Sequence, residues 1–267
     1  MGDKKNQHTV KVVIFAGGLG TRISEETDAR PKPIIEIGGK PMLWHIMKVY
    51  SHYGFNDFIV CLGYKGYIIK EYFMNYFLHN SDITIDVASN SMEVHGTNTE
   101  AFKVTLLETG INTKTAGRLK KVQKYTGNDE FMLAYGDSLA DIDLNALLAF
   151  HKKNNKIATV TAAQLDARFG GMEVVRNGDV TSFREKTKDE GKWMNAGFYV
   201  LKPEIFDYLD GDLEDTMWED GPLEKITAAG QLSAYRHTGY WKYMDALRDK
   251  MELENLWQTG NAKWRLW

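Results

Sequence analysis

The chain of 267 residues is 43% hydrophobic and 26% charged, with 33 basic and 36 acidic residues and a net charge of −3. This balance is typical of a globular protein with a sizeable core. The lack of a basic stripe argues against a duplex nucleic-acid binder, and no apolar run approaches the roughly 18 residues that a membrane span needs. The single cysteine, Cys61, excludes an internal disulfide and a cysteine-based zinc site, and the polar start of the chain is unlike a signal peptide, so we expect a cytoplasmic enzyme with no nucleic-acid or membrane partner.

The first part of the chain alternates short apolar strands with amphipathic helices. A β-branched apolar run predicts a buried strand over residues 10–16, and apolar residues at helical spacing after Pro41 predict a helix over 42–53. Strands that alternate with helices indicate an α/β fold with a mostly parallel, doubly wound sheet. The same patterns predict further strands over 57–62, 83–87, 104–107, 130–135 and 157–162, and further helices over 65–78 and 143–153.

The pattern changes after about residue 165. Short strands over 172–175, 180–185 and 198–201 follow one another, which predicts a smaller antiparallel layer set against the main sheet. Helices return over 224–229 and 246–257. Because no repeat or proline-rich linker interrupts the chain, we expect one domain over 1–267, with a core of about 10–165 and a C-terminal elaboration of about 166–267.

A glycine-rich loop, Gly17-Gly18-Leu19-Gly20-Thr21-Arg22, follows the first strand directly. Glycines in such a loop let backbone N–H groups approach a phosphate closely. The loop is not the dinucleotide fingerprint, because Ile23 stands at the third glycine position, and the later Gly39-Lys40 lacks the Ser or Thr of a P-loop. A phosphate site and a simple tight turn into a helix both remain open on the loop alone.

The segments after the loop narrow this choice. Arg30-Pro31-Lys32-Pro33-Ile34 and Gly38-Gly39-Lys40-Pro41-Met42 follow it. Together they resemble the sugar-1-phosphate nucleotidyltransferase family, whose signature is a GGxGTR loop followed by a lysine among prolines. The resemblance extends over about 11–265, and it is also carried by residues 24–27, 43–48, 63–67, 72–79, 115–120 and 244–250.

The resemblance implies a Rossmann-like fold, a nucleotide-binding core, a sugar-binding and oligomerising C-terminal part, and a homo-oligomer. The members it resembles most are cytidylyltransferases, so the expected reaction is Mg²⁺-dependent transfer of a cytidylyl group from CTP to α-D-glucose 1-phosphate for surface-polysaccharide synthesis. Because two anions must be brought together, positioning and electrostatics supply most of such catalysis. Two alternatives remain: the same chemistry on another phosphorylated acceptor, and a non-catalytic regulatory subunit that binds a nucleotide sugar.

The resemblance assigns charged residues to the reacting phosphates. Arg22 would hold the β and γ phosphates, and Lys32 would lie on the α-phosphate. Asp137 follows an apolar strand, where ligand groups gather in open α/β sheets, and with Asp245 it would bind Mg²⁺. A lone aspartate at a strand end is otherwise a turn or cap residue.

The remaining site residues are also assigned by resemblance. Glu185 and Asn195 would hold the sugar and Lys186 its phosphate, although Thr187 stands where the family usually has Pro and Ser138 where it has Gly. The residues do not decide between CTP and UTP. The nucleotide-binding residues would be Phe15, Ala16, Gly17, Gly18, Leu19, Gly20, Thr21, Thr109, Gly110, Thr113, Arg118 and Gly136.

Some conspicuous residues carry no chemistry in this interpretation. His45 and His52 lie seven apart on one predicted helix with no third metal ligand, so we expect them at a surface or interface. Cys61 lies in an apolar strand and is expected to be a small core residue. The tryptophans Trp257, Trp264 and Trp267 suggest docking of the C-terminus on the body or on another subunit.

Overall fold

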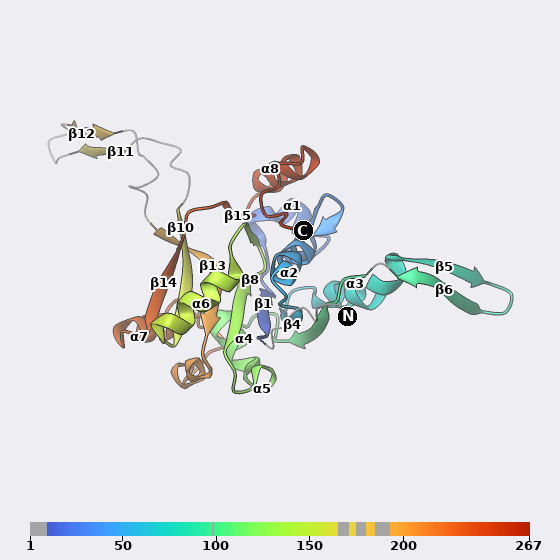
Figure 1. The fold of residues 1–267 in the computed structure, drawn as a ribbon, viewed down its shortest axis with the longest axis horizontal. Helices are drawn as coiled ribbons and strands as arrows, with labels where there is room; N and C mark the ends of the chain where they lie inside the picture. The colour runs from blue at the N-terminus through green and yellow to red at the C-terminus, as the bar shows by residue number, and fades with distance from the viewer. Residues whose placement is uncertain (1–9, 98, 165–170, 175–179, 185–192) are drawn as a thin grey trace, which may run out of the picture.

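A computed structural model describes residues 10–97, 99–164, 171–174, 180–184 and 193–267, and a seven-stranded sheet forms the centre of this part of the chain (Figure 1). The strand order is β14-β10-β13-β8-β1-β4-β7. The bounds of these strands, in chain order, are β1 Val12–Ala16, β4 Asp57–Leu62, β7 Lys103–Glu108, β8 Phe131–Tyr135, β10 Ala158–Gln164, β13 Trp193–Leu201 and β14 Leu232–His237.

The sheet is mostly parallel, as predicted. β1 pairs in parallel with β4 and β8, β4 with β7, and β10 with β14, whereas β13 runs antiparallel to both of its neighbours, β10 and β8. The assignment of residues 198–201 to a separate small layer was therefore wrong. Residues 196–201 are all buried, so this stretch is covered on both faces, and a continuous apolar run does not reveal which strands lie beside it.

Side chains from both faces of the sheet are buried. Along β1, Val12 and Ile14 point into one apolar cluster, and Val13 and Phe15 point into the other, because successive side chains of a strand alternate between faces. Helices that cover both faces make the sheet doubly wound, as predicted. Cys61 is fully buried in the second cluster, so its prediction as a core residue is confirmed.

The helices divide between the two faces. Residues of α2, α6 and α8 join the cluster around Val12, and residues of α4, η4 and α7 join the cluster around Val13. Helices α4 and α5 were not predicted. The helix bounds are α1 Ser24–Thr27, α2 Met42–His52, α3 Gly66–His79, α4 Thr115–Lys121, α5 Gln123–Thr126, α6 Leu144–Asn154, α7 Pro222–Ala228 and α8 Leu247–Gln258, with 3-10 turns η1 Thr21–Ile23, η2 Lys32–Ile34 and η4 Pro203–Tyr208.

Within the described part of the chain, four short antiparallel pairs lie outside the main sheet. The predicted strands at 172–175 and 180–185 form one of these pairs, and the predicted strand at 83–87 forms another with a partner that the sequence pattern did not show. The latter pair projects from the body as a ribbon (Figure 1). The pairs are β2 Glu36–Ile37 with β3 Lys40–Pro41, β5 Ser81–Asp86 with β6 Ser91–Thr97, β9 Ser138–Ala140 with β15 Trp241–Tyr243, and β11 Gly171–Val174 with β12 Val180–Arg184.

The strand order changes direction at β1. From β1 the chain proceeds to β4 and β7 on one side, and it then returns to place β8 on the other side of β1. In open α/β sheets the carboxyl ends of strands at such a switch point form a crevice for ligands. The glycine-rich loop after β1 and Gly136-Asp137 after β8 both begin there.

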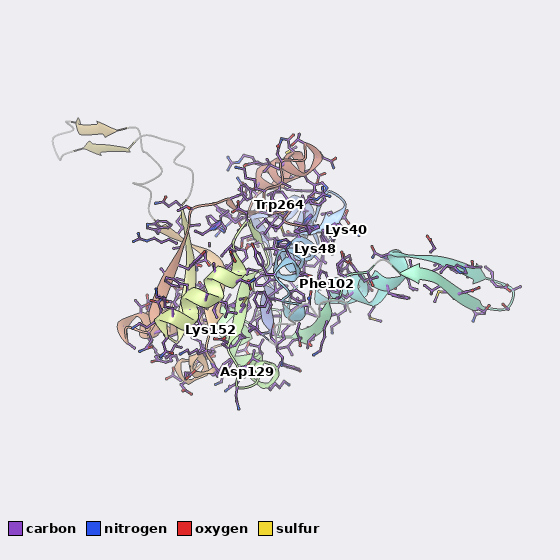
Figure 2. All side chains as sticks on the ribbon, in the orientation of Figure 1. Lys40, Lys48, Phe102, Asp129, Lys152 and Trp264 are labelled. Carbon is purple, nitrogen blue, oxygen red and sulfur yellow. The ribbon has the colours of Figure 1, made fainter. Side chains whose placement is uncertain are left out.

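The C-terminal segment folds back onto α2. Trp264, which is labelled in Figure 2, is fully buried, packs against Trp257 and donates a hydrogen bond to His45 at 3.4 Å. His45 is itself fully buried within the chain, so its expected position at a surface or interface was wrong. The aromatic rings of the C-terminus, more than 200 residues away, cover it. Within the described residues, no helix is long and apolar enough to cross a membrane.

Candidate active site

A cleft of about 570 Å³ opens at the switch point between β1 and β8. The loop after β1 and the end of β8 form its floor, since residues 15–22 and 135–137 line it. Lys32, Asp245, residues 111–115 and Arg118 line it as well. Most predicted phosphate-binding and nucleotide-binding residues therefore meet in one place.

The backbone of the glycine-rich loop leaves no room for side chains at its base. A Cβ on Gly17 would lie 2.0 Å from the Arg118 guanidinium, and one on Gly136 would lie 2.5 Å from the Phe15 carbonyl oxygen. Gly20 has a φ of 66°, a left-handed conformation that glycine adopts without strain. These positions need glycine for the shape of the loop, while Gly18 and Leu19 are exposed to the cleft.

Arg118 holds the base of this loop in place through hydrogen bonds. Its side chain is buried and donates to the carbonyl oxygens of Leu62 at 2.9 Å and of Gly17 at 3.0 Å, and to Thr109 Oγ1 at 2.5 Å. Desolvation lowers the pKa of its guanidinium from the ordinary value. Arg118 thus ties the carboxyl ends of β1 and β4 together while it lines the cleft.

A short ladder brings the two predicted metal ligands together. β9 follows Asp137 and β15 precedes Asp245; Tyr243 pairs with Ser138, and the Met244 N–H donates to the Asp137 carbonyl at 2.8 Å. Because the strands are antiparallel, the ends that carry the two aspartates lie side by side. Residues 108 positions apart in the sequence therefore present their carboxylates at one edge of the cleft.

Two basic side chains contact these carboxylates. Lys32 Nζ lies 2.8 Å from Asp137 Oδ2 and 3.2 Å from Asp245 Oδ1, and Arg22 donates to the other oxygen of Asp245. Burial opposes ionisation of Asp245, but hydrogen bonds and positive charge from Arg22 and Lys32 outweigh it and lower its pKa. The hydrogen bond to Asp245 in turn raises the pKa of Arg22.

The carboxylate pair suits a magnesium ion. Mg²⁺ takes oxygen ligands and is usually held by one or two carboxylates, with waters and substrate phosphates completing its shell. One ammonium group already lies within 3.2 Å of both carboxylates, so a single cation can contact Asp137 and Asp245 together. Among the described residues no group of three or more His, Cys, Asp or Glu could hold a metal, so these two carboxylates would need further ligands from a substrate.

The lining of the cleft also includes residues that the sequence did not reveal. Met217 and Glu219 line the cleft, and Thr115 Oγ1 donates to Glu219 at 3.0 Å although the two residues are 104 positions apart. Lys114, Ile111 and Asn112 line it as well. No periodicity or motif marks these irregular segments, so only their tertiary contacts identify them.

A chain of hydrogen-bonded side chains connects Glu219 with Asn195. Tyr135 donates to Glu219 and lies 3.3 Å from the hydroxyl of Tyr199, to which the Asn195 amide donates. The Asn195 side-chain oxygen accepts from the Gly197 N–H at 2.9 Å. Burial, with nearby Tyr199 and Glu219, raises the pKa of Tyr135, so this phenol stays protonated and holds its partners in place.

The other predicted positions differ in their relation to the cleft. Thr113 lines it, whereas Thr109 is buried and accepts a hydrogen bond from Arg118, and Gly110 lies against the Thr113 side chain. Ser138 is buried and its hydroxyl donates to the Ala196 carbonyl at 3.3 Å, next to Asn195. Glu185, Lys186 and Thr187 lie outside the described residues.

Comparison with known proteins gives a consistent picture. The nucleotidyl transferase family model matches residues 11–246. The chain is 53% identical over 259 residues to a glucose-1-phosphate cytidylyltransferase of Salmonella typhimurium and 52% identical over 259 residues to one of Salmonella typhi, covering 97% of this chain and 100% of each relative. The crystal structure of HddC from Yersinia pseudotuberculosis complexed with GMP-PN has the same fold, with a TM-score of 0.67, 24% identity and coverage of 93% of this chain and 100% of that one.

Proposed function

The chain belongs to the nucleotidyl transferase family, and we propose that it transfers the cytidylyl group of CTP to α-D-glucose 1-phosphate with release of pyrophosphate. The observation that carries this proposal is the meeting of Arg22, Lys32, Asp137 and Asp245 at the edge of a glycine-floored cleft. The two cytidylyltransferases that match over the whole chain at 52–53% identity support the choice of CTP and glucose 1-phosphate.

In this reaction a phosphate oxygen of the sugar 1-phosphate attacks the α-phosphorus of CTP, and the bond to the β-phosphate breaks. Backbone N–H groups of the glycine-rich loop would bind the triphosphate, because nothing at Gly18 blocks a close approach. Arg22, which is largely exposed, can reach the β and γ phosphates and stabilise the leaving pyrophosphate. Lys32 would neutralise charge on the α-phosphate as the new bond forms.

Asp137 and Asp245 would hold the magnesium ion beside Lys32. Bound there, Mg²⁺ would withdraw negative charge from the phosphate oxygens and orient them for displacement. The carboxylates are kept in position by the β9–β15 ladder and by Asp249, whose carboxylate accepts from the N–H groups of Asp245 and Ala246 at 3.1 and 3.0 Å. This support fixes the ligands before any substrate arrives.

The acceptor would bind next to Asn195. The Asn195 amide donates to Tyr199 and lies 3.5 Å from the hydroxyl of Tyr135, which lines the cleft. Glu185 and Lys186 are proposed to bind the sugar and its phosphate on the strength of the family resemblance. Phe15–Thr21, Thr109, Gly110, Thr113, Arg118 and Gly136 are proposed to form the nucleotide site.

We further propose that the chain is one nucleotidyltransferase domain that self-associates, acts in the cytoplasm and supplies CDP-glucose for surface polysaccharides. The sharing of one sheet by β1 and β14 supports a single domain, with its nucleotide-binding core over about 10–165 and its sugar-binding part over about 166–267. The exposed apolar side of the β5–β6 ribbon supports self-association, since an isolated two-stranded ribbon is only marginally stable in water.

Pyrophosphate release tests the proposal directly. The purified protein is given each of the four common nucleoside triphosphates with each of several sugar 1-phosphates, with Mg²⁺ or with a chelator. Release that needs CTP, glucose 1-phosphate and Mg²⁺ supports the proposal. Pyrophosphate release with CTP and a different sugar phosphate would keep the reaction and change the acceptor. If no pair releases pyrophosphate but the protein binds a nucleotide measurably, a regulatory subunit is favoured instead.

A further inference from the structure

The carboxylates that would hold Mg²⁺ are already neutralised by cations of the chain itself. Lys32 contacts both of them, at 2.8 and 3.2 Å, and Arg22 contacts the second oxygen of Asp245. The Lys32 side chain is only 12% exposed, so this ammonium group is held inside the edge of the cleft. Two positive and two negative groups leave the cluster with no net charge to attract another cation.

The same cluster offers a free metal ion too few ligands. Asp137 and Asp245 are the two acidic ligands here, and the described residues provide no third one. Magnesium gives up its waters reluctantly, and two carboxylates that are already paired with Lys32 and Arg22 compensate poorly for the loss of those waters. An ion could bind only if Lys32 left both carboxylates and other oxygens took part.

We propose that Lys32, assisted by Arg22, keeps divalent cations out of the nucleotide-free protein, and that binding of a nucleoside triphosphate draws both side chains onto its phosphates and so opens the metal site. The cation therefore binds with the nucleotide or after it, and not before. This inference rests on the proposed function, because it takes a triphosphate as the ligand of the cleft.

The two side chains are suited to this exchange. A lysine ammonium is a compact charge on a flexible stem, so it can occupy the position between two carboxylates and then move to a phosphate. Arg22 is 79% exposed and is therefore free to swing toward the β and γ phosphates. Both groups keep an anionic partner throughout, because charge-assisted hydrogen bonds to phosphate replace those to carboxylate.

Direct binding of Mn²⁺, followed by calorimetry and by electron paramagnetic resonance, tests the proposal without turnover. We expect no saturable binding to the free wild-type protein at concentrations that saturate its complex with CTP. In Lys32→Met the free protein should gain one Mn²⁺ site, with an affinity at least about tenfold above that of the free wild type, since an opposing charge a few ångströms away is removed. The effect of CTP on Mn²⁺ affinity should shrink in that variant, and by linkage the effect of Mn²⁺ on CTP affinity should shrink by the same factor.

Three further variants test where the site lies. Lys103→Met removes a lysine that lies 2.8 Å from Asp57 on the exposed edge of the sheet, so it breaks an ion pair of the same length and should leave Mn²⁺ binding unchanged. Lys32→Met combined with Asp137→Asn should lose the new site. Lys32→Gln provides a second neutral variant, and circular dichroism shows which proteins are folded.

The proposal is overturned if free wild-type protein binds Mn²⁺ as tightly as its CTP complex does, or if folded Lys32→Met and Lys32→Gln both bind it no better than wild type. The free-protein measurements involve neither catalysis nor an acceptor. A wild-type chain that releases no pyrophosphate, but whose Lys32→Met variant gains a Mn²⁺ site, would therefore reject the proposed function and keep only the exclusion of the cation by Lys32.

Discussion

At the scale of single residues, neighbours decide what a side chain can do. Arg118 shows this most clearly, because a guanidinium, normally a surface group, is buried here against backbone carbonyls at the ends of β1 and β4. The carbonyls satisfy its donors, and the glycine at position 17 provides the space it occupies. The arginine and the glycine are therefore one structural unit, although 101 residues separate them.

Substitution of Gly17 tests this unit. A Cβ at Gly17 would lie 2.0 Å from the Arg118 guanidinium, so Gly17→Ala should displace it and lower the free energy of unfolding by about 1–3 kcal/mol, with weaker CTP binding. A Cβ at Gly18 meets nothing within 4 Å, so Gly18→Ala should stay within about 0.5 kcal/mol of wild type. Urea unfolding and CTP titration provide the measurements, and equal stability of the two variants would contradict the packing argument.

The proposed metal ligands allow a second pair of substitutions. Asp137→Asn keeps the shape of the side chain but removes its charge, so Mg²⁺-dependent turnover should drop at least about 100-fold while the melting temperature stays close to that of wild type. Asp57→Asn removes a carboxylate that also pairs with a lysine at 2.8 Å, but outside the cleft, and should leave kcat unchanged. Full activity of Asp137→Asn would remove this residue from the metal site.

At the scale of secondary structure elements, the β5–β6 ribbon stands apart because its two faces differ so strongly. The register places Ile83 opposite Val94 and Ile85 opposite Met92 on one face, while Thr84 opposite Glu93 lies on the other. Ile85 is 61% exposed and Met92 is 52% exposed, and the ribbon that carries them projects away from the body (Figure 1). An apolar face of this kind is stable in water when another surface covers it.

If a second copy of the chain covers this face, charge placed on it should separate the copies. We expect Ile85→Glu to lower the molar mass measured by light scattering after size-exclusion chromatography. Thr84→Glu places the same charge on the polar face of the same strand and should keep the wild-type mass. A monomeric wild type, or an unchanged mass for both variants, would contradict self-association through the ribbon.

At the scale of the whole molecule, closure of the C-terminus over α2 makes stability depend on pH. Burial lowers the pKa of His45 from its ordinary value of 6.5 to about 4. The Nε2 atom of its ring lies 2.8 Å from the Ile37 carbonyl oxygen, and Nδ1 accepts a hydrogen bond from Trp264. Both ring nitrogens are therefore occupied, and an additional proton on Nδ1 would face the Trp264 N–H. The unfolded chain, in contrast, takes up that proton below pH 6.5.

The direction of this pH dependence follows from which state of the protein takes up the proton. Between pH 6.5 and 4 the unfolded chain binds a proton that the folded protein does not, so stability is retained above pH 6.5 and lost as the pH falls toward 4. His45 alone should lower the free energy of unfolding by about 2 kcal/mol between pH 7 and pH 5. Urea unfolding at both pH values should show a smaller difference for His45→Gln than for wild type, whereas His52→Gln, an exposed change on the same helix, should keep the wild-type difference. Equal pH dependence of all three proteins would contradict the assignment.

The sequence by itself determined the features that depend on local chemistry. The glycine-rich loop after β1, the lysine between Pro31 and Pro33 and the aspartate after β8 are readable because short-range sterics and strand-end geometry restrict which residues can stand there. Alternating strands and helices gave the parallel sheet for the same reason, since period and length are local properties. Membership of the family followed from these segments together.

Tertiary structure alone decided which distant segments meet. The place of β13 between β8 and β10, the approach of Glu219 to Thr115 and the burial of His45 under Trp264 depend on long-range packing, which leaves no periodic signal in either partner. The bridge from Lys32 to both Asp137 and Asp245 is of the same kind. The sequence names these charged residues, but only the folded chain places one ammonium group on both carboxylates, because the β9–β15 ladder brings their backbones together.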